Sequence, residues 1–235
     1  IGISKSNSDF FNKNIINIEK LLWKLKKIEI FTDNLKKEEL INFENNNEHL
    51  FSIVKNHKIY QVLEKDLSKN RYFKKRDLIN KNLSFINNYD LIINCDYFHP
   101  ITKKFFSKKI VKEYNSFAYT TIIKHKKISN LIATQIFTKK GPIAFLPISN
   151  TETSIVYSVH NSIYKKKENI ENLIQTYNFK YKINKIEKIN IFKLKSSNLR
   201  SYYHNNILAF GDLLHRIHPL AGQGFNMTVR DIKIF

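Results

Sequence analysis

The chain contains few of the residues that cross-link or sharply bend a polypeptide. Its 235 residues include one cysteine, four prolines and five glycines. With Cys95 alone, an internal disulfide is excluded, which fits a reducing compartment. The sequence also lacks any run of eighteen apolar residues and any signal-peptide pattern, so we predict neither a transmembrane helix nor a cleaved leader.

Acidic residues are scarce relative to basic ones. Forty Lys and Arg stand against twenty Asp and Glu, which gives a formal net charge of +20. Such an excess can indicate a nucleic-acid partner or an anionic membrane. The basic residues are spread along the chain, however, and no RNA-recognition, zinc-finger or helix-turn-helix signature accompanies them. We therefore predict no nucleic-acid partner and keep attraction to an anionic membrane surface as the alternative.

Apolar periodicity predicts a mixture of helices and strands. Segment 4–25 has helical spacing, with Ser8 or Asp9 as its N-cap. The continuous apolar run 91–93 predicts a parallel strand that is buried on both faces. Further strands are predicted within 27–43, at the start of 51–67, and in 117–124, 133–138, 141–148, 154–159 and 186–194, with helices in the rest of 51–67 and in 169–177.

The most specific pattern lies near the C-terminal end. A strand-like run, 207–210, is followed by Gly211 and Asp212, a glycine-rich stretch 221–224, and a helical pattern that starts at Phe225. Glycines let the backbone approach a flat ligand closely, and free N–H groups at a helix N-terminus favour negative charge. A carboxylate in the same place is suited to accepting hydrogen bonds from hydroxyls. Together these features predict a ligand cradle.

The pattern G-D-x-x-H-x-x-x-P-x-x-G-x-G-x-N over residues 211–226 resembles the second flavin-binding motif of aromatic-ring hydroxylases of the para-hydroxybenzoate hydroxylase fold. The segment HPLAGQGFN at 218–226 is most similar to the ubiquinone-biosynthesis hydroxylases. The segment F-T-x-x-G-P-I-A-F-L-P at 137–147 also resembles that family. The resemblance implies an α/β fold in which an FAD-binding Rossmann-like domain, incomplete here, is interleaved with an antiparallel β-sheet substrate domain. We assign 1–26, 49–100 and 205–235 to the first domain, and 27–48 and 101–204 to the second.

The resemblance also implies FAD as the cofactor and gives individual residues their roles. Asp212 would hold the ribityl hydroxyls, and Pro219 would shape the ring face beside the substrate. Backbone from Gly222 to Asn226 would stabilise negative charge on the reduced flavin. Pro219 and Gly222 are the expected catalytic positions, and the expected cofactor-binding residues are Gly211, Asp212, Pro219, Ala221, Gly222, Gly224, Phe225, Asn226 and Asp96.

Three histidines close to this motif raise the alternative of a metal site. His215 and His218 stand three residues apart, and His204 lies upstream of them. Because the cluster falls within the flavin motif, which explains it better, we predict no metal.

The implied activity is hydroxylation of a polyprenylated phenol in ubiquinone biosynthesis, through a C4a-hydroperoxyflavin formed with O₂. Electrons would come from NAD(P)H or a separate reductase, and other ubiquinone-biosynthesis proteins are possible partners. The expected location is the bacterial cytoplasm, peripheral to the inner membrane. The alternatives are a flavin reductase or halogenase of the same superfold, a non-catalytic assembly partner, and a basic binding module.

Several positions depart from the family pattern. The motif D-G-x-x-S-x-x-R, which handles flavin and pyridine nucleotide, matches Asp96 but has Tyr97 for glycine, Pro100 for serine and Lys103 for arginine. A tyrosine is strained at a positive φ where glycine is not, so the replacement is not conservative and the motif is degenerate. We therefore expect slow direct reduction by NAD(P)H. An arginine that contacts the cofactor in the family is replaced by His57.

The family's N-terminal G-x-G-x-x-G motif and its C-terminal helical end do not occur among these residues. The sequence starts at Ile1 and stops at Phe235 within a helical pattern. We therefore expect the natural protein to extend at both ends and its activity to need the full length.

Overall fold

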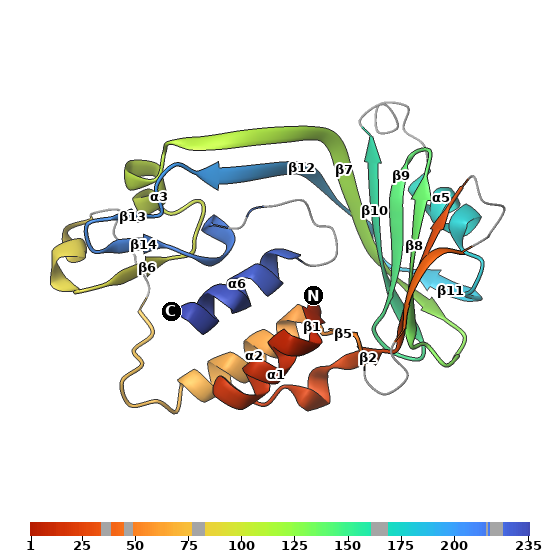
Figure 1. Ribbon diagram of the computed structural model, residues 1–235, viewed down its shortest axis with the longest axis horizontal. Coiled ribbons are helices and arrows are strands. Elements are labelled where there is room, and N and C mark those ends of the chain that lie inside the picture. Colours follow the sequence, from red (N-terminus) through yellow and green to blue (C-terminus); the bar gives the residue numbers. More distant parts are fainter. Residues whose placement is uncertain (34–38, 45–48, 77–82, 161–168, 215, 217–222) are drawn as a thin grey trace.

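Figure 1 shows the computed structural model, which describes residues 1–33, 39–44, 49–76, 83–160, 169–214, 216 and 223–235. A large β-sheet lies at one end of the molecule, and two small sheets lie toward the other end with most of the helices. Two long strands, β7 (Lys109–His125) and β12 (Asn190–Leu199), run between these two parts (Figure 1). The predicted α/β class is confirmed, whereas the division into two domains stays a prediction.

The large sheet has eight strands among the described residues, in the order β11-β7-β10-β9-β8-β3-β4, with β12 also paired to β7. Paired strands run antiparallel except β3 and β8, which are parallel. Besides β7 and β12, the strands are β3 (Lys27–Thr32), β4 (Glu39–Glu44), β8 (Ile132–Thr138), β9 (Gly141–Pro147), β10 (Glu152–His160) and β11 (Ile183–Ile186). The strands predicted within 27–43 and between 117 and 159 are therefore confirmed.

The core of the large sheet follows from strict alternation along its central strands. Ile155, Tyr157 and Val159 of β10 point to one face and are fully buried there. Helix α5 (Ile170–Tyr177) covers that face with Ile170 and Ile174. The side chain of Asn169, one residue before α5, accepts hydrogen bonds from two backbone N–H groups of the first turn, which confirms the predicted helix and explains where it begins.

Position 141 in the large sheet accepts only glycine. Gly141 follows the turn between β8 and β9 with φ +129°, a conformation that other residues rarely adopt. A Cβ at this position would lie 2.0 Å from the backbone carbonyl oxygen of Ser158. The close approach of β9 to β10 therefore requires glycine here.

The two small sheets and the helices around them form the rest of the molecule. One sheet has the order β1-β5-β2, and the other has the order β13-β14-β6. The first comprises β1 (Gly2–Ser4), β5 (Phe51–Ile53) and β2 (Trp23–Leu25), with α1 (Lys5–Asn14), η1 (Glu19–Leu21) and α2 (Asn56–Leu67). The second comprises β13 (Tyr203–His204), β14 (Ile207–Ala209) and β6 (Ile92–Asn94), with η2 (Ser84–Asn88), α3 (Pro100–Phe105), η3 (Gly211–Leu213) and α6 (Gln223–Ile234).

The helical prediction for 4–25 is only partly right. Helix α1 begins at Lys5, so neither Ser8 nor Asp9 is its N-cap. Ser8 is buried inside the helix, where its hydroxyl donates back to the carbonyl of Lys5. After the helix ends at Asn14, the chain turns and forms η1 and strand β2, because residues 23–25 pair with β5.

Two strand predictions also need correction. Strand β6 is parallel to β14 as predicted, but it is not buried on both faces, since the side chain of Ile93 is 47% exposed. Among the described residues β6 pairs only with β14, which makes it an edge strand, and the side chain of Ile93 is only partly covered there. The single strand predicted at 186–194 is instead β11 and β12, which pair with successive parts of β7. No helix of the described chain has the length and apolar character needed to span a membrane.

Candidate functional site

The predicted cradle lies where β6 and β14 end. Because these strands are parallel and in register, with Asn94 opposite Ala209, they leave the sheet at the same edge. The backbone N–H of Phe210 donates to the carbonyl of Asn94 at 3.0 Å and holds the two exits together. Asp96 and Asp212 therefore follow neighbouring strand ends. In α/β sheets of this kind, ligands bind outside the carboxyl ends of the strands.

Gly211 forms the sharp turn out of β14. Its φ of +61° lies in the left-handed region that favours glycine, and the residue is buried. A Cβ there would lie 3.5 Å from the sulfur of Cys95 and 4.0 Å from the methyl carbon of Thr228. Gly211 thus sits between the end of β6 and helix α6, and its backbone conformation explains why this position is glycine.

Asp212 is the carboxylate that the site presents to solvent. It lies in η3, is exposed, and forms no hydrogen bond or ion pair with another described residue. Burial raises the pKa of the nearby Cys95 thiol, and the negative charge of Asp212 raises it further. A solvent-facing carboxylate at the end of a strand can accept hydrogen bonds from ligand hydroxyls.

Asp96, by contrast, is partly used by the protein. One of its carboxylate oxygens accepts a hydrogen bond from the backbone N–H of Phe98 at 2.8 Å. Its carbonyl oxygen accepts from the hydroxyl of Thr102 at 2.6 Å. Asp96 therefore shapes the turn that leads into α3, and its predicted contact with the cofactor stays a prediction.

Asn226 has a clear structural role. Its side-chain oxygen accepts hydrogen bonds from the backbone N–H of Ser4 and the amide of Asn7, both at 2.9 Å. Its side-chain nitrogen donates to the carbonyl of Gly2 at 3.0 Å. These bonds attach α6 to β1 and α1. The predicted cofactor role of its backbone is not tested by them.

The remaining predicted residues divide into two groups. Gly224 and Phe225 lie in the first turn of α6, where Phe225 packs against the core of the β1-β5-β2 part. Pro219, Ala221 and Gly222 lie outside the described residues, as do His215 and His218. The structure therefore brings Gly211, Asp212 and Asp96 to one edge and places α6 against η3 behind them.

The turn at Tyr97 does not adopt the left-handed backbone that would strain a tyrosine. Among described residues other than glycine, only Asn115 and Asn205 have a positive φ, so Tyr97 is not left-handed. The Asp96 carboxylate closes this turn by accepting the N–H of Phe98, and such a turn does not require glycine.

Tyr97 also carries a cluster that sequence reasoning missed. The ammonium of Lys109 donates to the Tyr97 hydroxyl at 2.6 Å and lies 4.1 Å from the ring centroid. The guanidinium of Arg216 lies 4.3 Å from the same centroid. The Lys109 hydrogen bond and the two cations lower the pKa of the Tyr97 hydroxyl. No sequence signal predicts this cluster, because its members come from the turn after β6, the start of β7 and the loop after η3.

The residues present suit the ribityl part of a flavin dinucleotide. Asp212 offers an unshared carboxylate, and the left-handed Gly211 lets the backbone turn beside it. Helix α6 packs against η3, and Thr228 in the middle of this helix lies beside Gly211. This arrangement, in an α/β protein with a large antiparallel sheet alongside, defines an FAD-dependent flavoprotein.

Comparison with known proteins identifies the family. The family model described as FAD binding domain matches residues 95–234, and the chain belongs to this family. Its cofactor is accordingly FAD, as the flavin motif predicted.

The similar proteins agree with the predicted resemblance. The ubiquinone biosynthesis monooxygenase COQ6 of Danio rerio is 27% identical over 145 residues, covering 44% of this chain and 30% of that protein. The 3-demethoxyubiquinol 3-hydroxylase of Escherichia coli (strain K12) is 30% identical over 105 residues, covering 42% and 27%. The matched segments thus span less than a third of either relative.

Solved structures confirm the fold. PqsL, a probable FAD-dependent monooxygenase from Pseudomonas aeruginosa, has a TM-score of 0.76 at 11% identity, covering 99% of this chain and 73% of PqsL. CmlS, a flavin-dependent halogenase, has a TM-score of 0.71 at 13% identity, covering 97% of this chain and 48% of CmlS. At these identities the likeness concerns the fold alone, which monooxygenases and a halogenase share.

Proposed function

We propose that the full-length protein is an FAD-dependent hydroxylase that adds oxygen to the aromatic ring of a polyprenylated phenol in ubiquinone biosynthesis. The observation that carries this proposal is the unshared carboxylate of Asp212 beside the left-handed Gly211, at the paired ends of β6 and β14. The similarity to COQ6 and to the Escherichia coli hydroxylase supports the reaction class and the substrate.

The chain's own residues have positioning roles in this reaction. Asp212 accepts hydrogen bonds from the ribityl hydroxyls, and Gly211 keeps the backbone clear beside them. When bound, FAD supplies the activation of O₂. The large sheet forms the substrate side of the pocket, where it excludes water from the reacting ring.

We propose that the substrate is reached at an anionic membrane surface. A phenol with a long polyprenyl tail is dissolved in lipid, so the enzyme must meet it there. The net charge of +20 favours such docking, at roughly 1 kcal/mol for each basic residue near the surface. Co-sedimentation with phosphatidylglycerol vesicles at low salt tests this step, and its absence would remove the membrane from the proposal.

Product analysis tests the reaction itself. The full-length FAD-loaded protein, supplied with a chemical or enzymatic reductant, is incubated with a prenylated phenol and, separately, with a soluble hydroxybenzoate. We expect oxygen to be added to the prenylated phenol. Hydroxylation of the soluble acid alone would overturn the proposed substrate, and no oxygen transfer to either compound would overturn the proposed activity.

The role of Asp212 is tested by FAD binding. Replacing Asp212 with Ala should weaken FAD by about 1.5–3 kcal/mol, the range for hydrogen bonds to a charged group. Asp212→Asn keeps one acceptor oxygen and should lose less. Fluorescence titration of the apoprotein measures both affinities. An unchanged affinity in Asp212→Ala would mean that the carboxylate does not contact the cofactor.

We also propose that electrons reach the flavin from a separate reductase. Tyr97 replaces the family's glycine, and its ring and hydroxyl are occupied by Arg216 and Lys109. We therefore expect NADPH alone to bleach the full-length flavoprotein slowly under anaerobic conditions, as followed by absorbance. Rapid bleaching would contradict this, and faster bleaching in Tyr97→Gly than in wild type would support it.

A second candidate is a non-catalytic assembly partner with a flavoprotein fold. The Tyr97 cluster favours it, because bulky and charged side chains occupy a turn where the family has glycine. An FAD-loaded protein that turns over no phenol, even with an artificial reductant, would support this candidate.

A further inference from the structure

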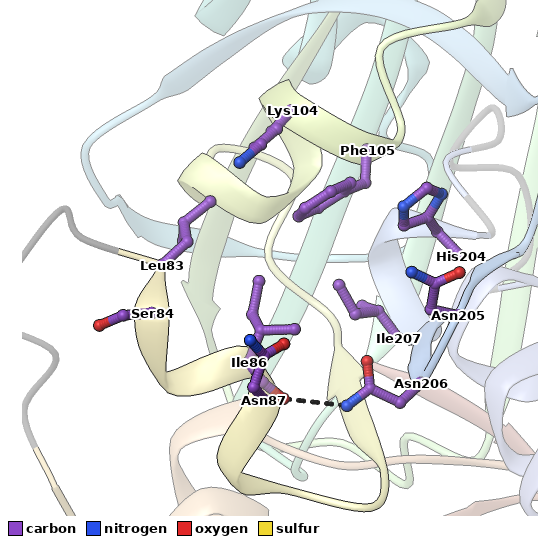
Figure 2. A pocket seen from close by; sticks show the side chains of 10 residues that line it. All are labelled: Leu83, Ser84, Ile86, Asn87, Lys104, Phe105, His204, Asn205, Asn206 and Ile207. Carbon is purple, nitrogen blue, oxygen red and sulfur yellow. Dashed lines mark hydrogen bonds between the residues drawn. The ribbon is translucent and has the colours of Figure 1, made fainter.

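A cavity of about 480 Å³ opens between the β13–β14 hairpin and the two short helices η2 and α3 (Figure 2). It lies at the amino end of β14, since Ile207 begins that strand, whereas Asp212 follows its carboxyl end. Cofactors of α/β sheets bind at the carboxyl ends of strands. The cavity is therefore at the opposite end of β14 from the predicted flavin site.

Two aromatic rings form one wall of the cavity. Phe105 and His204 are stacked, with ring centroids 4.6 Å apart and planes inclined by 25° (Figure 2). Backbone pairing fixes His204, because β13 and β14 form an antiparallel hairpin in which it faces Ile207. The hairpin turn at Asn205 has a positive φ of 49°, which asparagine tolerates. The backbone of the β13–β14 hairpin thus fixes the position of His204 in this wall of the cavity.

The floor of the cavity is also preformed. The side-chain nitrogen of Asn206 donates to the carbonyls of Ile86 and Tyr89, at 2.9 Å and 2.6 Å. These bonds hold η2 against the hairpin. Leu83 and Ile86 supply apolar surface to the cavity, and Ile207 lies buried behind it (Figure 2). A flat apolar ligand can therefore enter without rearrangement of the backbone.

The charge of the cavity has one sign. Lys104 lines it, and no aspartate or glutamate does among the residues that the structure describes. The ammonium of Lys104 lies 5.2 Å from the centroid of Phe105 and forms no ion pair with any residue that the structure describes. Contact with an aromatic face leaves the charge of the ammonium uncompensated. The site consequently favours an anion, which a carboxylate satisfies through charge-assisted hydrogen bonds.

We propose that this cavity binds a small planar aromatic carboxylic acid. The carboxylate contacts Lys104, and the ring lies on Leu83 and Ile86 with its edge toward the Phe105–His204 stack. The site is independent of the proposed hydroxylase activity, because none of these residues belongs to the flavin motif.

The test uses benzoate with the full-length FAD-loaded protein, by isothermal titration calorimetry and by NMR of histidine ring protons. We expect saturable binding and a shift of the His204 resonances, assigned with His204→Gln. Lys104→Met should weaken benzoate about tenfold or more, the effect of losing a charge-assisted hydrogen bond. Lys108→Met is the matched control: Lys108 is exposed near the same helix, does not line the cavity, and should change affinity less than about twofold.

Ligand analogues test the two parts of the proposal. Benzamide lacks the negative charge and cyclohexanecarboxylate lacks the planar ring, so both should bind at least about fivefold more weakly than benzoate. No saturation by 10 mM benzoate, an equal loss in the Lys104 and Lys108 variants, or unshifted His204 resonances would each overturn the site. Equal affinity for cyclohexanecarboxylate would overturn the aromatic clause.

Discussion

In the large sheet, Ile123, Ile155 and Tyr157 are fully buried on one continuous face, whereas in the β13-β14-β6 sheet Ile93 keeps nearly half of its surface exposed. The two parts differ in how they are held. The large sheet relies on strand pairing and on apolar clusters that its strands build. The β1-β5-β2 part and α6 also depend on hydrogen bonds from Asn226 to the first residues of the chain. The large sheet is thus held mainly by strand pairing and apolar packing, whereas side-chain hydrogen bonds from Asn226 attach α6 to the β1-β5-β2 part.

The largest expected effect comes from two glycines, one in each part. Gly141→Ala would place a Cβ 2.0 Å from the carbonyl oxygen of Ser158, at a φ unfavourable to alanine. Because backbone cannot yield, we expect a loss of about 4 kcal/mol or more in the free energy of unfolding. Gly2→Ala meets the ring of Phe51 at 2.3 Å, but a side chain can move, so we expect about 1–3 kcal/mol.

Urea unfolding followed by circular dichroism measures both losses, and soluble expression reports the first if the protein fails to fold. Equal losses of unfolding free energy in Gly141→Ala and Gly2→Ala would contradict this expectation. The two parts of the molecule would then accommodate an added Cβ equally well.

The next effect concerns the polar attachment of α6. Asn226→Ala removes the bonds to Gly2, Ser4 and Asn7, and we expect a loss of about 2–3 kcal/mol. Amide hydrogen exchange should speed up in residues 2–14 and in α6, while β9 and β10 stay protected. The matched control is Asn198→Ala, an exposed asparagine of β12, which should change stability by less than about 0.5 kcal/mol. Faster exchange in β9 and β10 would show that the two parts unfold as one unit.

The smallest expected effect is a loss of folding stability that appears only at alkaline pH. Tyr181 lies in the core of the large sheet, where burial raises its pKa to about 12 and its hydroxyl donates to the side chain of Asn130 at 3.0 Å. The folded state therefore holds this proton between pH 10 and 12, where the unfolded state releases it. The resulting stability is full below pH 10 and falls as the pH rises to 12, by on the order of 2 kcal/mol.

Tyr181→Phe provides the control for this titration. It should lose about 1 kcal/mol at neutral pH through the missing hydrogen bond, and its alkaline decline should be shallower by the Tyr181 contribution. Parallel declines in the two proteins between pH 10 and 12 would rule out Tyr181 as the group responsible.

Local sequence patterns predicted the elements whose determinants are local. Asn169 marks the start of α5 through its own hydrogen bonds, and alternation along β10 places Tyr157 in the core. The pattern of strand, Gly211, Asp212 and helix likewise predicted β14, the turn that follows it and α6. Each of these features depends on residues that are close in sequence.

Distant contacts explain what could not be predicted. Residues 23–25 continue a helical pattern but form β2, because β5 offers a partner strand. Asn226 looks like a motif residue, yet its side chain serves Gly2, Ser4 and Asn7. The cations over Tyr97 come from elements whose proximity no spacing reveals. In each case a tertiary partner decided the outcome.

The bond from Asn226 to Ser4 closes a loop across 222 positions of the chain. During synthesis, β1 can pair with β5 early, whereas the hydrogen bonds that attach α6 to β1 can form only after almost the whole of this sequence has left the ribosome. Non-local closures of this kind slow folding, and unpaired strands exposed meanwhile are prone to association. The large sheet closes earlier, since its pairings from β7 to β12 are complete by Leu199. Docking of α6 onto β1 and α1 should thus be a late step among these residues, and translation pauses placed before Asn226 should yield nascent chains whose residues 2–14 are more sensitive to protease.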